Sequence, residues 1–218
     1  MQAVAAGWAT REGSFPMSEP RTLFFDVGGV LLTNAWDTAA RNRAIEEFAL
    51  DAVDFHTRHG MVKTAFETGR LSLDSYINKT VFHIERPFSR DDFKAIMFAQ
   101  SKVLGETLEW VRSLAAAGTP MFTLNNESRE LHEYRVRAFG LCSIFRSFLT
   151  SCYLGQVKPD EEVYRNALGI AGCSAEEGVF VDDRPVNVET AATLGLKSIR
   201  FESLPQLRAA LSEFGITT

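Results

Sequence analysis

The feature that most constrains the fold is a series of short apolar runs separated by helical patterns. The first run, residues 22–27 (TLFFDV), stops at Gly28-Gly29. Runs of this length bounded by glycine are typical of strands buried on both faces of a parallel sheet. Similar runs follow at residues 121–125, 147–151, 179–182 and 197–201. Because these runs alternate with helical patterns, the sequence predicts an α/β fold in which helices cover both faces of a parallel sheet.

Residues 34–103 interrupt this alternation. They contain no strand pattern, but they hold four stretches with one apolar face each, at residues 44–49, 61–66, 73–81 and 93–97. Ser89 and Asp92 form a capping-box pattern before the last stretch. We therefore predict a small all-helical cap at residues 34–103, inserted after the first strand of a core made of residues 21–33 and 104–218. Residues 1–20 mix Gly, Ser, Pro and charge, which predicts a flexible N-terminal tail.

Composition argues against several classes of function. The net charge is −5 and the basic residues are scattered, so no nucleic-acid partner is expected. No apolar run is long enough to cross a membrane, and residues 1–20 lack the pattern of a signal peptide. The three cysteines, Cys142, Cys152 and Cys173, have no CxxC spacing and favour a reducing compartment. We expect a cytoplasmic protein, and both a monomer and a homodimer agree with the sequence.

Polar residues follow the carboxyl ends of the predicted strands, where ligands bind in open α/β sheets. These residues are Asp26, Asn125, Asn126, Lys158, Asp182 and Asp183. Each one alone has an ordinary structural explanation as a turn, a helix cap or a solvated loop. Together they place three carboxylates and a lysine at one edge of the sheet. Like charges this close repel unless a cation lies among them, and hard oxygen ligands favour Mg²⁺.

The motifs FFDVGGVLL, TLNN, GQVKPDEEVYRNAL and VFVDDRPVNVETA, in this order, resemble the four motifs of the haloacid dehalogenase superfamily. The resemblance covers residues 22–201, and the helical insert is similar to that superfamily's C1 cap. It implies a three-layer, Rossmann-like core with a parallel five-stranded sheet. Within the superfamily, the chain is most similar to the branch that holds glucose-1-phosphate phosphatases and the amino-terminal phosphatase domain of soluble epoxide hydrolase.

The resemblance implies a Mg²⁺-dependent phosphatase that acts on a small phosphorylated metabolite. Asp26 would attack phosphorus and form an aspartyl-phosphate, while Lys158 would offset the charge of the phosphoryl group. Asn125 and Asn126 would donate hydrogen bonds to the phosphate. The implied metal ligands are Asp26, the backbone carbonyl of Gly28, Asp182 and Asp183.

Two positions depart from the superfamily's pattern. Gly28 stands where its phosphatases usually carry a second Asp as general acid and base, and Asn125 stands where Ser or Thr is usual. Glu127 is a candidate replacement for the missing acid, although a solvated loop acid is its simpler interpretation. Gly28 also keeps two alternatives open: a hydrolase of the phosphonatase or dehalogenase type, and a non-catalytic protein that binds a phosphorylated ligand. The Asp182-Asp183 pair argues against a dehalogenase.

The remaining polar residues in helical patterns are expected at exposed helix surfaces. His56 and His59 are predicted to lie on a solvated face of the cap. Arg135 and Arg137 are predicted to lie on the surface of a core helix.

Overall fold

The computed structural model describes residues 21–217, so the tail predicted at residues 1–20 lies outside the described residues. One five-stranded sheet forms the centre of the fold, with the strand order β3-β2-β1-β4-β5. Every neighbouring pair of strands is parallel. The strands are β1 (Thr22–Phe25), β2 (Met121–Asn125), β3 (Ser147–Thr150), β4 (Gly178–Asp182) and β5 (Lys197–Arg200). All five lie where the apolar runs predicted them.

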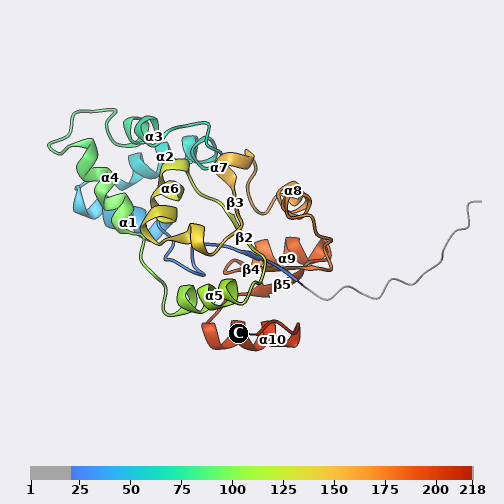
Figure 1. The fold of residues 1–218 in the computed structure, drawn as a ribbon. Helices are drawn as coiled ribbons and strands as arrows, with labels where there is room; N and C mark the ends of the chain where they lie inside the picture. Colours follow the sequence, from blue (N-terminus) through green and yellow to red (C-terminus); the bar gives the residue numbers. More distant parts are fainter. Residues whose placement is uncertain (1–20, 218) are drawn as a thin grey trace, which may run out of the picture.

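Helices connect the strands and also form the insert. Those of the insert are α1 (Thr38–Glu47), α2 (Ala52–Glu67), α3 (Leu73–Thr80) and α4 (Arg90–Ala99). Those that follow are α5 (Thr107–Ala116), α6 (Arg129–Ala138), α7 (Ser151–Leu154), α8 (Glu161–Ala171), α9 (Pro185–Thr193) and α10 (Leu204–Glu213), with a short 3-10 helix η1 (Leu141–Ser143). Figure 1 shows α1 to α4 gathered at one end of the molecule, away from α5, α9 and α10.

The central strand β1 is buried on both faces, as its uninterrupted apolar run predicted. Leu23 and Phe25 pack into the cluster that includes residues of α5 and α10. Phe24, which points the opposite way, packs with residues of α8 and α9. Side chains alternate between the two faces of a strand, so this single run supplies both apolar layers. The three-layer, Rossmann-like core with a parallel five-stranded sheet is thus confirmed.

The insert has an apolar cluster of its own, made from one face of each of its four helices. Phe93 lies at the centre of its aromatic contacts, with ring centroids 5.9 Å from Trp36, 5.2 Å from Phe48 and 6.5 Å from Phe55. The predicted capping box is present: Ser89 and Asp92 each accept a hydrogen bond from the other's backbone N–H at the start of α4. These packed helices support our proposal that residues 34–103 form a cap.

The two chain segments that join the insert to the core run side by side. Thr33 N–H donates to the Lys102 carbonyl (2.9 Å), and Lys102 N–H donates to the Thr33 hydroxyl (3.0 Å). The Thr33 hydroxyl in turn donates to the Gln100 carbonyl (2.6 Å). These hydrogen bonds hold the two connecting segments together. We call this pair of segments, at Thr33 and at residues 100–102, the strap.

Two side chains predicted to lie at the surface, His59 and Arg135, are in fact buried, and so is His132. His59 is 7% exposed and its Nδ1 contacts the Tyr76 hydroxyl at 2.8 Å, so its predicted solvated position is wrong. Arg135 is 2% exposed, which corrects its predicted surface position. His132 is 5% exposed and contacts the Thr150 hydroxyl at 3.2 Å. Helical spacing alone did not separate these positions from solvated ones.

Within residues 21–217, none of the helices combines the length and the apolar character needed to cross a membrane.

The insert offers a matched test of its own apolar cluster. Ile77 is fully buried, whereas Ile84 is 54% exposed in the same insert. We expect Ile77→Ala to lower the free energy of unfolding by about 2–5 kcal/mol, because it removes buried methyl groups and leaves a cavity. Ile84→Ala should change it by no more than about 0.5 kcal/mol. Urea unfolding measures the free energy of unfolding of both variants. Equal losses in the two variants would contradict the burial of Ile77 in the apolar cluster of the insert.

The buried histidines predict how stability depends on pH. Burial lowers the pKa of His59 and of His132 to about 4, from the ordinary value of about 6.5. Between these pH values the unfolded chain binds more protons, so acid favours unfolding. The stability present above pH 6.5 is therefore lost as the pH falls toward 4, on the order of 2 kcal/mol per histidine at pH 5.

We expect His132→Asn to lose correspondingly less stability than the parent chain between about pH 7.5 and pH 5. Urea unfolding of both proteins at the two pH values measures this difference. The comparison at pH 7.5, where both imidazoles are neutral, reports only the change in packing. An unchanged pH dependence in the variant would show that His132 takes up its proton without unfolding.

Candidate active site

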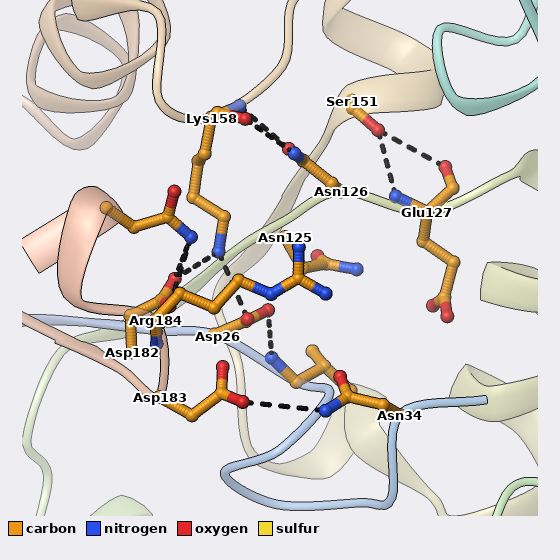
Figure 2. Close-up of polar contacts among 12 residues, drawn as sticks. Asp26, Asn34, Asn125, Asn126, Glu127, Ser151, Lys158, Asp182, Asp183 and Arg184 are labelled. Carbon is orange, nitrogen blue, oxygen red and sulfur yellow. Dashed lines mark hydrogen bonds and ion pairs between the residues drawn. The ribbon is translucent and has the colours of Figure 1, made fainter. Parts of the chain in front are cut away.

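Three carboxylates and one ammonium group meet at the carboxyl edge of the sheet, as predicted (Figure 2). Asp26 follows β1, and Asp182 and Asp183 stand at the end of the neighbouring strand β4. One oxygen of each carboxylate lies within 4.8 Å of one oxygen of both others. Lys158 Nζ lies 2.5 Å from Asp182 Oδ2 and 3.3 Å from Asp26 Oδ2. The parallel pairing of β1 with β4 brings these groups together.

Asp26 is held by backbone on one side and by charge on the other. Its N–H donates to the Val181 carbonyl (2.8 Å), which continues the pairing of β1 with β4. The Val27 N–H donates to Asp26 Oδ1 (2.7 Å). Burial raises the pKa of Asp26 to about 7, against the lowering effect of Lys158, and the nearby Asp182 and Asp183 raise it further. Burial and the two neighbouring carboxylates therefore disfavour the charged form of Asp26, while Lys158 favours it.

Asp182 is fully buried and every part of its carboxylate is engaged. Asn187 Nδ2 donates to both oxygens at 3.0 Å, and the Arg184 backbone N–H donates to Oδ1 at 2.8 Å. Lys158 Nζ donates a further hydrogen bond to Oδ2. Sequence reasoning missed Asn187. One feature of the sequence could have indicated its role: Asn187 lies five residues after Asp182, near the start of α9, and this helix begins beside the site.

Asp183 presents a free oxygen to the site. Its Oδ2 accepts a long hydrogen bond from Asn34 Nδ2 (3.5 Å), while its Oδ1 is buried and has no hydrogen-bond partner among residues 21–217. Burial, chiefly, and the charge of Asp182 raise the pKa of Asp183. Gly29 has a φ of +76°, and a Cβ there would lie 2.3 Å from Asp183 Oδ2. Only glycine therefore allows this approach.

The donor set fits a hard divalent cation. With all groups ionised, three carboxylates and one ammonium sum to −3 + 1 = −2, which one divalent ion would neutralise. All the side-chain donors are oxygens, the class of ligand that Mg²⁺ prefers. The unpartnered Asp183 Oδ1 adds an oxygen that no protein group among the described residues satisfies. A buried acceptor of this kind is costly unless something binds it.

The two predicted amides lie in different positions. Asn125 is 3% exposed, its Oδ1 accepts from the Thr150 hydroxyl (3.1 Å), and its Nδ2 lacks a partner in the part of the chain described. That N–H₂ group is available to an anion in the site. Asn126 instead bonds the backbone of Lys158 twice: its Nδ2 donates to the carbonyl and its Oδ1 accepts from the N–H, both at 2.8 Å. Asn126 thus positions the lysine.

Glu127 is buried, and one of its two carboxylate oxygens is paired while Oε2 has no hydrogen-bond partner among the described residues. It is 7% exposed, and its Oε1 lies 2.5 Å from Arg135 Nη1. Arg135 also donates to the carbonyl of Thr33, in the strap that joins the insert to the core. The interpretation of Glu127 as a solvated loop acid is therefore wrong. Its carboxylate serves a buried ion pair between the loop after β2 and α6.

Gly28 lies beside Asn34, which fills the space that a larger side chain would need. A Cβ on Gly28 would lie 2.6 Å from Asn34 Oδ1. That separation is shorter than any ordinary contact, so an acid at this position would displace Asn34. A side chain at residue 28 therefore requires the Asn34 amide to move.

A cavity of about 460 Å³ opens over these groups. Its floor includes Asp26, Asn125 and Lys158 from the core, and its opposite wall comes from α1 and α2 of the insert. Arg41, Lys63 and Glu67 are the charged side chains of that wall. A small anionic molecule with a polar body fits such a cavity.

Solved structures share this fold. A haloacid dehalogenase family enzyme from Bacteroides thetaiotaomicron, in complex with magnesium and inorganic phosphate, has a TM-score of 0.70 and 20% identity, covering 86% of this chain and 98% of that one. A predicted haloacid dehalogenase-like hydrolase from Porphyromonas gingivalis has a TM-score of 0.71 and 20% identity, covering 92% and 100%. At this level of identity, the likeness shows the fold alone.

Two curated relatives match this chain over only part of their own length. A flavin mononucleotide hydrolase of Arabidopsis thaliana is 28% identical over 161 residues, which are 73% of this chain and 64% of the relative. A drimenol cyclase of Aspergillus calidoustus is 24% identical over 197 residues, 88% of this chain and 36% of the relative. The chain therefore spans less than two thirds of either relative.

The sequence model of one family matches residues 20–195, which include all four motifs and every residue of the charge cluster. The chain belongs to the haloacid dehalogenase-like hydrolases.

Proposed function

We propose that this hydrolase is a Mg²⁺-dependent phosphatase of a small phosphorylated metabolite, with Asp26 as its nucleophile. The observation that carries the proposal is the cluster of Asp26, Asp182 and Asp183, with Lys158 in contact with the first two and with Asp26 and Lys158 lining the cavity. Two relatives point the same way. One is named a flavin mononucleotide hydrolase, and the Bacteroides enzyme was crystallised with magnesium and inorganic phosphate.

Asp26 performs the covalent step. One of its oxygens forms a bond to phosphorus while the bond from phosphorus to the leaving-group oxygen breaks. Water then attacks phosphorus, the bond to Asp26 breaks, and inorganic phosphate leaves. The Val27 N–H fixes the carboxylate for this attack through its bond to Oδ1 (2.7 Å). Two moderate barriers thereby replace a single high one.

The neighbouring groups balance the charge. Lys158, placed 3.3 Å from Asp26 Oδ2, offsets the negative charge of nucleophile and phosphoryl group. Asn125 Nδ2, buried and unpartnered among the described residues, donates to a phosphoryl oxygen. Asp26, the Gly28 carbonyl, Asp182 and Asp183 would hold Mg²⁺, Asp182 directly or through water. When bound, the ion supplies positive charge opposite the phosphoryl oxygens.

The remaining parts of the assignment are proposals of the same kind. Cys142, Cys152 and Cys173 are free thiols, which supports our placing the protein in the cytoplasm. A monomer and a homodimer remain equally compatible with the chain. One alternative function has a specific observation behind it: residue 28 is a glycine with Asn34 beside it, and the lack of an acid there would suit a protein that binds a phosphorylated ligand without turnover.

The nucleophile is tested by Asp26→Asn. We expect Mg²⁺-dependent release of phosphate from p-nitrophenyl phosphate, from sugar phosphates or from flavin mononucleotide, and a loss of at least about 10³-fold in the variant. An amide has the same shape but cannot form the aspartyl-phosphate. Circular dichroism serves as the folding control. Undiminished turnover by the folded variant would contradict the role of Asp26 as the nucleophile. Binding of phosphate by the parent protein without any turnover would favour the alternative, a protein that binds a phosphorylated ligand.

The metal ligands are tested without any activity measurement. Asp183→Asn removes a charge from the oxygen that lacks a protein partner, so we expect Mg²⁺ affinity to fall by about tenfold or more. Isothermal titration calorimetry measures that affinity directly. Asp91→Asn, at a side chain that is 92% exposed in the insert, is the matched control and should bind Mg²⁺ like the parent. Equal affinities in all three proteins would place the ion elsewhere.

A further inference from the structure

The proposed phosphatase needs a proton source that residue 28 does not supply. When an alkyl phosphate is cleaved, the leaving-group oxygen must take up a proton, and a positioned acid is worth about 10²–10⁴ in rate. Residue 28 is a glycine, and Asn34 occupies the space beside it. An amide does not titrate, so Asn34 cannot act as this acid. Any acid for the leaving group must therefore come from another wall of the cavity.

The acidic side chains around the cavity are Asp26, Asp37, Glu67 and Glu127. Asp26 is committed to phosphorus. Asp37 caps the start of α1 by accepting from the Ala40 N–H (2.8 Å). Glu127 is held through Oε1 by Arg135 at 2.5 Å, while its Oε2 is buried and has no hydrogen-bond partner among the described residues. Glu67 has only a long contact, 3.9 Å, with Lys63 Nζ. Among the described acids that line the cavity, it is the one whose carboxylate no hydrogen bond or close ion pair holds in place, which leaves it free to turn toward a leaving group.

The backbone of Glu67 is fixed to the core. Its carbonyl accepts a hydrogen bond from the Ser151 hydroxyl (2.6 Å), and Ser151 Oγ also accepts from the Glu127 N–H (2.9 Å). Just beyond it, Gly69 lies so close to the Cys152 carbonyl that a Cβ would stand 2.2 Å from its oxygen. The end of α2 is thus docked onto α7. This contact holds the Glu67 backbone in place, and the Glu67 side chain lines the same cavity as Asp26.

We propose that Glu67 of the insert is the general acid and base of this active site. In the first step, as the Asp26 oxygen bonds to phosphorus, the bond from phosphorus to the leaving-group oxygen breaks and that oxygen takes the Glu67 proton. In the second step, the Glu67 carboxylate removes a proton from the attacking water while the bond from phosphorus to Asp26 breaks. Glu67 ends protonated and Asp26 ends free, so the cycle closes on alcohol and phosphate.

The surroundings of Glu67 suit this role. Burial is the main influence and raises the pKa of Glu67, while Lys63 on the same helix, Arg184 of the core and Arg41 of α1 lower it, in that order of effect; the net pKa lies above the ordinary value. His59 and Tyr76 are the other titratable groups nearby in the insert. They contact each other at 2.8 Å, and burial keeps His59 neutral at neutral pH and raises the pKa of Tyr76. Neither competes as a proton donor.

The test compares leaving groups, and it rests on the proposed function. Glu67→Gln keeps the shape of the side chain and removes its proton. We expect kcat/KM to fall by about 10²–10⁴ for the alkyl phosphate that the parent cleaves best among sugar phosphates and flavin mononucleotide. For p-nitrophenyl phosphate, whose leaving group departs without protonation, kcat/KM should stay within about twofold. Because kcat/KM reports the steps up to leaving-group departure, the later hydrolysis of the aspartyl-phosphate does not mask the difference.

Two further measurements separate chemistry from structure. In the parent, kcat/KM for the alkyl phosphate should decline as the pH rises through the pKa of Glu67, since the acid must carry its proton. That decline should vanish in Glu67→Gln. Glu67→Asp should recover part of the lost rate. Glu46→Gln, an exposed glutamate on α1, is the matched control and should behave like the parent with both substrates.

The outcomes are distinct. Equal losses on both substrates, or no loss on the alkyl phosphate, would overturn the assignment of Glu67 while leaving the phosphatase intact, as Asp26→Asn would show. A parent enzyme that cleaves only p-nitrophenyl phosphate would also overturn it, since no acid would then be at work. A parent enzyme without metal-dependent hydrolysis would overturn the proposed function, and with it this inference.

Discussion

The site depends on the contact between the Lys158 ammonium group and two buried carboxylates. Its Nζ lies 2.5 Å from Asp182 and 3.3 Å from Asp26, and its side chain is 2% exposed. Removing one partner from such a cluster would leave an uncompensated charge in a poorly solvated place. Much of the surrounding structure serves to hold this contact. Asn126 binds the lysine backbone on both sides, and Asn187 fixes the plane of the Asp182 carboxylate.

The fold was predictable because its signals are local. The TLFFDV run could only be buried on both faces, and Leu23, Phe24 and Phe25 fill both layers. The convergence of Asp26, Lys158 and Asp182 was predictable for a related reason: all follow strands of one parallel sheet, whose carboxyl ends meet at a single edge. The resemblance of the motifs to a known superfamily then assigned roles that the residues alone did not settle.

The partners of individual side chains were not predictable, because they join distant parts of the chain. Arg135 looked like a surface residue of α6, yet it binds Glu127 and the carbonyl of Thr33, 102 residues earlier. No spacing rule reports such a contact. Asn126 was predicted as a phosphate ligand, and the sequence did not show that its amide also bonds the backbone of Lys158, 32 residues away. Helical periodicity placed His59 on a helix but could not show that Tyr76 covers it.

The crowding between Gly28 and Asn34 has a consequence for how such a site can change over time. A Cβ at residue 28 would meet Asn34 Oδ1 at 2.6 Å, and Asn34 also reaches Asp183. Introducing an aspartate at residue 28 alone would therefore force Asn34 away from Asp183 before the new acid could be useful. The two positions are therefore coupled: a side chain at residue 28 requires Asn34 to turn to another rotamer or to be replaced. Any change at residue 28 would thus be felt at Asp183, through the hydrogen bond that Asn34 now donates to it.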